Sequence, residues 1–127
     1  MILLDTSYWI FLLNKKHSIK HDDLNKIVVC NPVIQEILQG IKDDHLFQEI
    51  KQSILSFPLV SDPVRTDLYI HAAQIYRLGR RKGYTIRSSV DCLIAAIAIE
   101  NDIPVLHKDR DYDIISEFTS LKIVCSL

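Results

Sequence analysis

The chain has 127 residues, of which 48% are hydrophobic and 24% charged, and its formal net charge is −1. These values predict one domain spanning residues 1–127, and they exclude a disordered chain and a protein that coats nucleic acid through a general positive charge. No apolar run approaches the roughly 20 residues that span a bilayer, and no basic leader precedes the N-terminal apolar stretch. We therefore expect a soluble cytoplasmic protein that does not enter the membrane.

Strand-like apolar runs alternate with helical patterns along the chain. The expected strands cover residues 2–4, 26–30, 57–60, 104–106 and 122–125. The expected helices cover 7–13, 31–41, 43–55, a segment that opens at Asp62-Pro63, 88–100 and 112–118. Asn31-Pro32 and Asp62-Pro63 each combine a capping residue with a proline, which indicates a helix start. The alternation predicts an α/β three-layer sandwich with a central parallel sheet of about five strands.

The three cysteines are expected to act as small buried hydrophobic residues. Their number is odd, and Cys30, Cys92 and Cys125 lie far apart in separate apolar runs. This pattern favours free thiols in a reducing compartment over a disulfide or zinc framework.

Acidic residues follow the ends of several predicted strands. Asp5 comes directly after the first strand, and Glu36 lies in the second turn of the helix that leaves the second strand. Asp109 lies three residues beyond the strand at 104–106, with Asp111 close behind it. Because sites in open parallel sheets form beyond the carboxyl ends of the strands, we expect these acids to lie close together.

Asp91 is brought to the same edge by the connectivity of the chain. Only residues 101–103 separate its helix from the strand at 104–106, so the helix must end where that strand starts. The first turn of the helix, with Asp91, must then lie at the opposite edge of the sheet, beside the other acids.

Each acid also has a simpler explanation. Asp5 would cap the helix that follows it, and Ser88-x-x-Asp91 fits a capping box, while the others would be solvated helix or loop residues. Together, crowded like charges repel and raise each other's pKa, and a divalent cation removes that cost. Oxygen ligands favour Mg²⁺ or Mn²⁺ over zinc, and such ions clamp phosphates and activate water. The set therefore indicates a phosphodiesterase site.

Three stretches carry a resemblance to a known family: MILLDTS, NPVIQEILQG and GYTIRSSVDCLIAAIAIENDIPVLHKDRDYD. They resemble PIN-domain proteins, specifically VapC-type toxins of toxin–antitoxin pairs, over essentially the whole chain. The resemblance implies a PIN-like fold and a Mg²⁺-dependent endoribonuclease in which metal-activated water hydrolyses RNA, with Mn²⁺ as a substitute ion. It also implies an antitoxin protein that holds the enzyme inactive.

The resemblance implies roles for individual residues. By motif, Asp5, Glu36, Asp91 and Asp109 match the catalytic acidic quartet of the family, and Asp111 is a fifth metal-ligand candidate. Asp5 and Asp91 would ligate the metal most directly, while Glu36 and Asp109 would hold it through waters, position the attacking water or bind a second ion. The sequence departs from the family at position 107, where a His stands in place of the common Thr or Ser.

A basic run leads into the segment that carries Asp91. Its candidate RNA-binding residues are Arg80, Arg81, Lys82 and Arg87. Basic residues at a helix end often do no more than complement the helix dipole. Phosphate binding is favoured here because an acidic pocket must offset its repulsion of RNA, and Arg87 is the best candidate because it is nearest the site.

The helix at 7–13 is apolar on more than one face, with Tyr8, Trp9, Phe11 and Leu12 as its large side chains. These residues either belong to the core or form an antitoxin-binding groove, and the family resemblance favours the groove. Self-association through the helix at 69–76, giving a homodimer, is an alternative use of apolar surface.

Two other functions compete with the nuclease. Haloacid-dehalogenase-type phosphohydrolases also place an Asp after the first strand, but they need a second Asp two residues on, where this chain has Ser7. A non-catalytic partner-binding module on the same scaffold is disfavoured by the complete set of acids. His17 and His21 have the spacing of a zinc pair but lack further ligands nearby, so surface histidines are expected.

Overall fold

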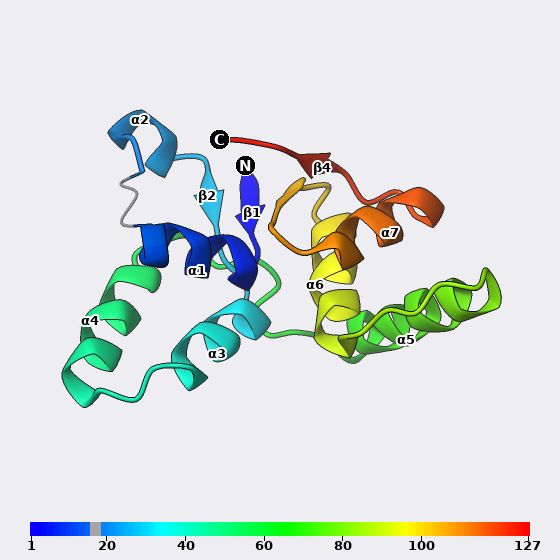
Figure 1. Cartoon of the computed structure of the whole chain (residues 1–127), viewed down its shortest axis with the longest axis horizontal. Coiled ribbons are helices and arrows are strands. Elements are labelled where there is room, and N and C mark those ends of the chain that lie inside the picture. The colour runs from blue at the N-terminus through cyan, green and yellow to red at the C-terminus, as the bar shows by residue number, and fades with distance from the viewer. Residues whose placement is uncertain (16–18) are drawn as a thin grey trace.

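A parallel sheet forms the centre of the computed structural model, which describes residues 1–15 and 19–127 (Figure 1). Within these residues the sheet has four strands in the order β2-β1-β3-β4, and all neighbouring pairs are parallel. The strands are β1 (Ile2–Leu4), β2 (Ile27–Val28), β3 (Val105–Leu106) and β4 (Ile123–Val124).

The segment at 57–60 differs from its predicted form. It makes a single parallel bridge, between Leu59 and Val29, so the sheet has four strands where about five were expected. The Val29 amide donates to the Pro58 carbonyl and the Val60 amide donates to the Val29 carbonyl, both at 2.9 Å. Pro58 has no N–H to extend this ladder, so the pairing stops after one bridge.

Seven helices are described around the sheet in residues 1–15 and 19–127 (Figure 1). They are α1 (Thr6–Lys15), α2 (His21–Leu24), α3 (Asn31–Gln39), α4 (Asp44–Ile54), α5 (Thr66–Arg81), α6 (Ser89–Glu100) and α7 (Arg110–Phe118). In this part of the chain, we find no helix with the length and apolar character needed to cross a bilayer.

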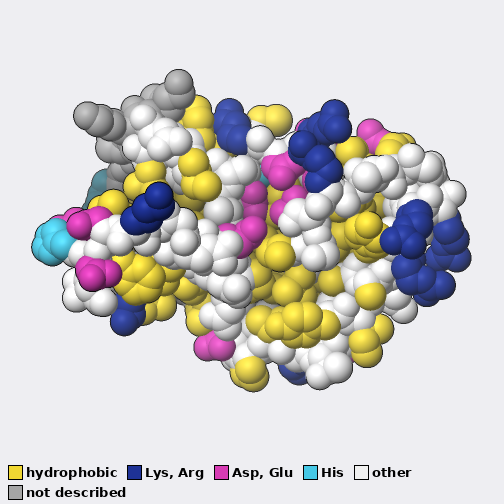
Figure 2. Space-filling model, turned by 60° about the horizontal axis from the view of Figure 1, so that its bottom comes forward, with side chains coloured by type: hydrophobic (Ala, Val, Ile, Leu, Met, Phe, Trp, Pro, Cys, Tyr) yellow, Lys and Arg dark blue, Asp and Glu magenta, His cyan; other side chains and the backbone are white. Residues whose placement is uncertain are grey.

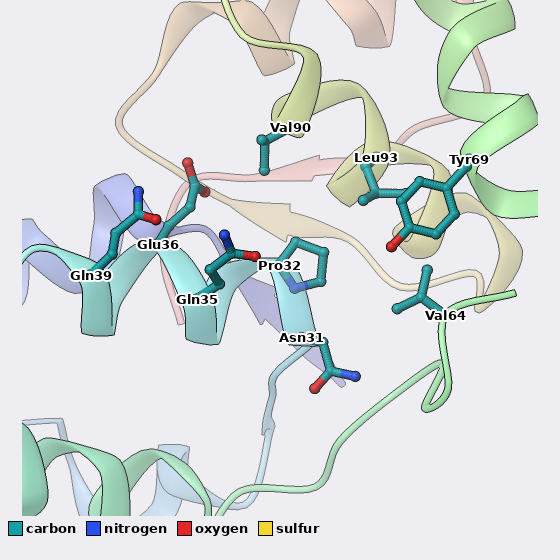
Figure 3. Close-up of a pocket in the computed structure, with 9 residues that line it drawn as sticks. All are labelled: Asn31, Pro32, Gln35, Glu36, Gln39, Val64, Tyr69, Val90 and Leu93. Atoms are coloured by element: carbon teal, nitrogen blue, oxygen red, sulfur yellow. The ribbon is translucent and has the colours of Figure 1, made fainter. Parts of the chain in front are cut away.

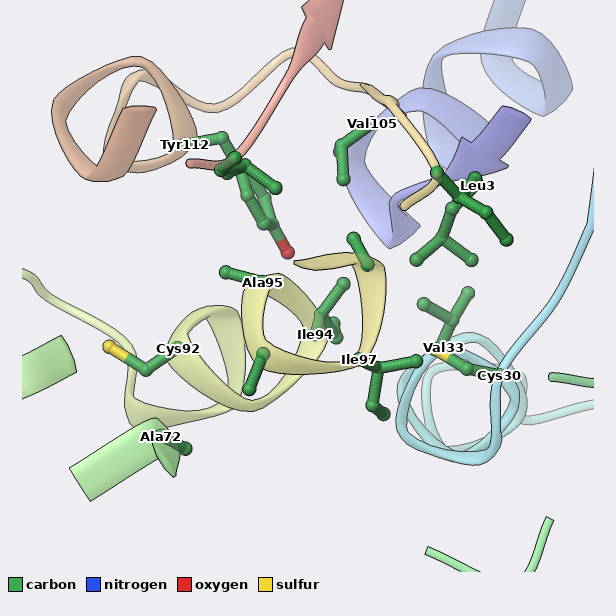
Figure 4. Close-up of a cluster of buried hydrophobic side chains, with 14 of the residues drawn as sticks. Leu3, Cys30, Val33, Ala72, Cys92, Ile94, Ala95, Ile97, Val105 and Tyr112 are labelled. Carbon is green, nitrogen blue, oxygen red and sulfur yellow. The ribbon is translucent and has the colours of Figure 1, made fainter. Parts of the chain in front are cut away.

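The two faces of the sheet have separate hydrophobic cores, which confirms the three-layer α/β architecture. Leu3 pairs with Val28 and Val105, and this row packs against α6 (Figure 4). The opposite face carries Leu4 and other side chains that pack with α1; this second cluster contains Leu4, Leu12, Ile27 and Leu106. Because side chains alternate along a strand, neighbouring residues of β1 belong to different cores.

The fully apolar character of α6 follows from its place in the fold. It lies between the sheet and α5, and its residues Ile94, Ala95 and Ile97 are completely buried (Figure 4). The short link from Glu100 to β3 fixes the end of α6 at the starting edge of the sheet, so its first turn lies at the other edge.

The two predicted cap-plus-proline signals do not act as caps. Cys30, rather than Asn31, is the N-cap of α3, and the Asn31 side chain instead donates to Asp62 Oδ1 at 3.0 Å. The Asp62 carboxylate thus bonds to the first residue of α3 and does not cap a helix of its own, and α5 begins only at Thr66. By contrast, Asp43 caps α4, accepting from the Leu46 amide at 2.7 Å.

The end of α5 directs the chain back toward the sheet. Gly83 has a φ of 87° and follows the last helical turn. The Tyr84 amide donates to the Gly79 carbonyl at 2.9 Å and the Gly83 amide to the Arg80 carbonyl at 3.0 Å, which is a Schellman motif. This turn leads to Arg87 and the start of α6.

The cysteine prediction holds at two of three positions. Cys30 and Cys92 are buried free thiols, but Cys125 is exposed because it follows the edge strand β4 at the end of the chain. Of the two histidines considered for zinc, His21 is exposed and His17 lies outside the described residues.

Candidate active site

Three aspartates are almost completely buried at the carboxyl edge of the sheet. Asp5 follows β1 and is 3% exposed, Asp91 lies in the first turn of α6 at 4%, and Asp111 lies in the first turn of α7 at 1%. Figure 2 shows Asp and Glu side chains gathered near the middle of one face of the molecule. Burying carboxylates is costly unless each is paired, hydrogen-bonded or bound to a metal.

Asp5 combines a structural contact with one that points into the site. Its Oδ2 atom accepts from the Ser7 amide at 3.0 Å and from the Ser7 hydroxyl at 2.6 Å, so Asp5 caps the start of α1. Its Oδ1 atom accepts from the Tyr112 hydroxyl at 2.5 Å. The simple capping explanation is therefore correct for one oxygen only.

The Tyr112 hydroxyl joins Asp5 to Asp91. The same oxygen lies 3.3 Å from Asp91 Oδ1, and the Tyr112 side chain is completely buried. Burial and the neighbouring carboxylates raise the pKa of Tyr112 well above its usual value, which keeps its proton available for donation. The sequence analysis did not identify this residue; the signal available there was a tyrosine in the first turn of a helix that opens with several acids.

Asp91 does not act as a cap. Ser88 is the N-cap of α6, but its side chain makes no capping hydrogen bond within the described residues. The expected capping box of Ser88 and Asp91 therefore does not form. Asp91 Oδ2 is buried and has no hydrogen-bond partner among the described residues. Burial, and then the charges of Asp5 and Asp109, raise the pKa of Asp91 to about 8.

Asp109 and Asp111 extend the acidic cluster from the start of α7. Asp109 caps α7, with its Oδ1 atom accepting from the Asp111 amide at 3.0 Å. Asp111 Oδ2 accepts from the Arg87 amide at 3.0 Å, whereas its Oδ1 atom is buried without a hydrogen-bond partner in the part of the chain that is described.

The donor set fits a divalent cation. Carboxylate oxygens of Asp91, Asp109 and Asp111 lie within 4.8 Å of one another. Two oxygens of these residues, Asp91 Oδ2 and Asp111 Oδ1, are buried and lack a hydrogen-bond partner within residues 1–15 and 19–127. An all-oxygen set of this kind suits a hard ion.

Glu36 lies at the rim of the cluster. Its Oε1 atom accepts from the Thr6 hydroxyl at 2.9 Å, which ties α3 to the start of α1. Burial raises the pKa of Glu36, the Thr6 bond opposes that rise, and the charges of Asp5 and Asp109 add to it. The predicted quartet therefore interacts electrostatically, although Glu36 is only half-buried.

A cavity of about 320 Å³ opens beside Glu36 (Figure 3). It lies between α3, α5 and α6. Its lining residues are Asn31, Pro32, Gln35, Glu36, Gln39, Val64, Tyr69, Val90 and Leu93. Among these lining residues Glu36 is the acid, so the cavity borders the acidic cluster at Glu36.

The predicted basic residues divide into two groups. Arg87 lies in the site, with Nη2 3.4 Å from Asp109 Oδ1 and Nε 3.7 Å from Asp111 Oδ1, and its side chain is 61% exposed. Arg80, Arg81 and Lys82 are exposed at the end of α5, where Figure 2 shows a cluster of Lys and Arg at one end of the molecule.

His107 holds the loop that carries Asp109. Its Nδ1 atom accepts from the Asp109 amide at 3.0 Å, and its Nε2 atom lies 3.0 Å from Asp113 Oδ1. Because Nδ1 accepts a hydrogen bond, the neutral ring carries its proton on Nε2 and donates it to Asp113. The unusual histidine therefore orients an acid through the backbone.

The aromatic residues of α1 have different surroundings. Tyr8 and Phe11 lie with ring centroids 5.5 Å apart, and Lys108 Nζ is 4.5 Å from the Phe11 ring. Leu12 packs in the core rather than on the surface. Trp9 lines an apolar groove of about 220 Å³ between α1, α3 and α4, together with Leu13, Ile37, Ile50, Ser53, Ile54 and Phe57.

The PIN domain family model matches residues 2–117. This chain belongs to the PIN-domain family. Relatives of this PIN domain include ribonuclease VapC11 of Mycobacterium tuberculosis and a VapC ribonuclease of Mycobacterium bovis. Each is 35% identical to it over 96% of this chain and 96% of its own length. The predicted VapC-type resemblance is confirmed.

Solved structures share the fold of this PIN domain. DNA-bound VapBC from Salmonella typhimurium matches with a TM-score of 0.76 and 18% identity, over 97% of this chain and 96% of that one. VapBC2 of Rickettsia felis, bound to a promoter DNA fragment, matches with a TM-score of 0.75 and 19% identity, over 98% of each chain. PIN nucleases generally use divalent metal ions, which agrees with the oxygen cluster of this PIN domain.

The raised pKa of Asp91 predicts how the metal-free PIN domain responds to pH. The folded state binds a proton at Asp91 up to about pH 8, whereas the unfolded chain releases it near the ordinary pKa of 3.8. Stability should therefore fall as pH rises between these values. In EDTA, we expect the thermal midpoint of the wild type to be lower at about pH 8 than at about pH 5, and Asp91→Asn to reduce this loss.

Asp102→Asn is the matched control for this measurement. Asp102 is exposed and bonds to Lys122 at the other edge of the sheet, so its replacement should leave the wild-type pH profile unchanged. A wild type and an Asp91→Asn variant with parallel pH profiles would contradict the raised pKa.

Proposed function

We propose that this chain is a Mg²⁺-dependent endoribonuclease that acts in the cytoplasm as the toxin of a toxin–antitoxin pair. The observation that carries the proposal is the cluster of Asp91, Asp109 and Asp111 at the edge of the sheet, in which two buried carboxylate oxygens lack a hydrogen-bond partner among the described residues. The VapC ribonuclease relatives, at 35% identity over nearly the full length, support RNA as the substrate.

The proposed metal ligands are Asp91, Asp109 and Asp111, with Asp5 and Glu36 completing the site. Asp5 is joined to Asp91 through Tyr112, and Glu36 interacts with the charges of Asp5 and Asp109. Bound Mg²⁺, or Mn²⁺ in its place, would polarise the phosphodiester and lower the pKa of a water molecule. The hard all-oxygen donor set favours these ions over zinc.

The protein's own groups would position the substrate. Arg87 extends from the cluster with an exposed guanidinium, which suits a bidentate contact with a phosphate. Glu36 faces the cavity between α3, α5 and α6, where it would orient the attacking water or accept its proton. Arg80, Arg81 and Lys82 would bind RNA phosphates further along the strand.

The apolar groove between α1, α3 and α4 is the proposed antitoxin site. Trp9 and Leu13 of α1 face Ile50 and Phe57 across it, and Leu13 is 51% exposed. Tyr8 and Phe11 lie on the same helix, with Leu12 supporting it from the core. An exposed apolar groove of this kind suits an amphipathic segment of a partner protein.

A homodimer is a further part of the proposal. Tyr69 and Ile70 are large, exposed side chains on α5, and Tyr69 lines the cavity at Glu36. Two copies meeting through this face would bring their acidic clusters toward each other.

The competing functions fit the site less well. A haloacid-dehalogenase-type hydrolase would need an acid where Ser7 stands, and Ser7 instead bonds to Asp5 and to the Lys108 amide. A non-catalytic module would have no reason to keep buried carboxylate oxygens without partners, since these only lower its stability.

Asp91→Asn is expected to abolish RNA cleavage while leaving the fold intact, because the amide cannot replace an anionic ligand. Cleavage of an end-labelled RNA with added Mg²⁺ measures this, and EDTA should stop the wild-type reaction. The products should carry 5′-phosphate and 3′-hydroxyl ends. Asp102→Asn should cleave like the wild type. Cleavage by the wild type in excess EDTA would contradict the metal-dependent reaction.

Arg87→Ala is expected to weaken RNA binding and to make its salt dependence shallower by about one unit of slope, because one phosphate contact is lost. Binding is measured in the Asp91→Asn background so that the RNA stays intact. Arg80→Ala is the comparison at the end of α5. An unchanged affinity and slope for Arg87→Ala would leave Arg87 as a partner of Asp109 and Asp111 alone.

Leu13→Asp is expected to separate toxicity from neutralisation, because a charge in the apolar groove excludes the antitoxin without reaching the acids. Expression should arrest growth, and co-expression of the cognate antitoxin should rescue the wild type but not this variant. Leu55→Asp is the matched control, since Leu55 is similarly exposed but does not line the groove. Equal rescue of both variants would exclude this groove.

A further inference from the structure

The Tyr112 hydroxyl bonds to carboxylates that come from different elements of the fold. It donates to Asp5 Oδ1, after β1, at 2.5 Å, and lies 3.3 Å from Asp91 Oδ1, in α6. Tyr112 itself belongs to α7. A single oxygen therefore connects the first strand and two helices at the point where the acids meet.

Asp5 is held from both sides by this arrangement. Ser7 donates to its Oδ2 atom through the amide and the hydroxyl, while Tyr112 donates to its Oδ1 atom. An ionised carboxylate offers about four acceptor positions, so these contacts leave room for a cation. The contacts with Ser7 and Tyr112 also fix the direction in which the remaining acceptor position of Asp5 points.

Packing alone does not account for the hydroxyl. The Tyr112 ring is completely buried and lies 5.2 Å, centroid to centroid, from the His107 ring. A phenylalanine ring would fill the same space, and a buried hydroxyl is costly unless it is hydrogen-bonded. The hydrogen bonds of this hydroxyl go to Asp5 and Asp91, so its contribution lies in the arrangement of these carboxylates.

The arrangement also leaves one oxygen of Asp91 uncommitted. Asp91 Oδ1 faces the Tyr112 hydroxyl, whereas Oδ2 is buried without a partner in residues 1–15 and 19–127. Asp91 is also one of the three residues, with Asp109 and Asp111, that each offer a carboxylate oxygen within 4.8 Å of the others. Holding one side of the carboxylate thus presents the other side to the cluster.

We propose that Tyr112 is a positioning residue for the metal site: its neutral hydroxyl holds Asp5 and Asp91 together and orients the remaining acceptor positions of these two carboxylates toward one divalent cation. The inference rests on the proposed function for the existence of that cation. A neutral donor suits this task because it relieves the repulsion of two carboxylates without occupying the cation's place with a positive charge. Partners that orient metal ligands typically contribute 10- to 100-fold in metal affinity.

The test is a calorimetric titration of the RNA-free protein with Mn²⁺, comparing wild type and Tyr112→Phe. We expect the variant to bind Mn²⁺ about tenfold more weakly. RNA cleavage should then require a correspondingly higher Mn²⁺ concentration, with the maximal rate recovering toward that of the wild type at saturating metal. A purely structural role would not produce this separation of metal requirement from maximal rate.

Tyr84→Phe is the matched control. It removes a tyrosine hydroxyl that donates to a carboxylate, Glu117, at 2.7 Å, outside the acidic cluster. Its Mn²⁺ affinity should equal that of the wild type. Thermal unfolding in EDTA checks the fold of both variants, and the rise in midpoint on adding Mn²⁺ provides a second measure of metal affinity.

Different results would contradict the role of Tyr112 and the proposed nuclease function. Equal or tighter Mn²⁺ binding by Tyr112→Phe would overturn the role of Tyr112, including where the variant is less stable in EDTA, while leaving a metal-dependent wild type intact. A wild type that binds no Mn²⁺ and cleaves no RNA would overturn the proposed function itself.

Discussion

The burial of several carboxylates at one point is the constraint on which the site depends. Each buried oxygen needs a hydrogen bond, a countercharge or a cation, because removing an unpaired charge from water is costly. Asp5 is satisfied by Ser7 and Tyr112, and one oxygen of Asp111 by the Arg87 amide. Among the described residues, the buried carboxylate oxygens that still lack a hydrogen bond are Asp91 Oδ2 and Asp111 Oδ1. Both residues belong to the cluster whose ligand atoms lie close together.

The order of the strands brings these carboxylates together at a single place. β1 and β3 are neighbours, so the segments that leave them stay in contact beyond the sheet. The Asp5 amide donates to the Leu106 carbonyl at 3.0 Å, and the Lys108 amide donates to the Ser7 hydroxyl at 2.9 Å. These bonds hold Asp5 against the loop of Asp109, and the buried α6 brings Asp91 to the same edge.

The sequence predicts the elements and the acids better than it predicts the contacts between them. The position of Asp91 follows from the short link between α6 and β3, which is a constraint within the chain itself. The role of Tyr112 does not follow from the sequence, because its hydroxyl bonds to Asp5, 107 positions away. No pattern in the sequence indicates that these two residues are in contact. The start of α5 differs from the prediction for a similar reason, since Asp62 bonds to the side chain of the distant Asn31 and not to the first turn of a helix that follows it.

Arg87 and Tyr112 relieve the negative charge in different ways, and the difference matters for a site that must accept both a cation and a phosphate. The Arg87 guanidinium is largely exposed and its contacts of 3.4 and 3.7 Å are long, so the ion pairs hold it only weakly. It can turn toward a phosphate without disturbing the core. The Tyr112 hydroxyl is buried and neutral, so it would remain hydrogen-bonded to the carboxylates when a cation or a phosphate binds. In the proposed nuclease, the exposed Arg87 guanidinium would therefore contact the substrate, and the buried Tyr112 hydroxyl would support the metal ligands.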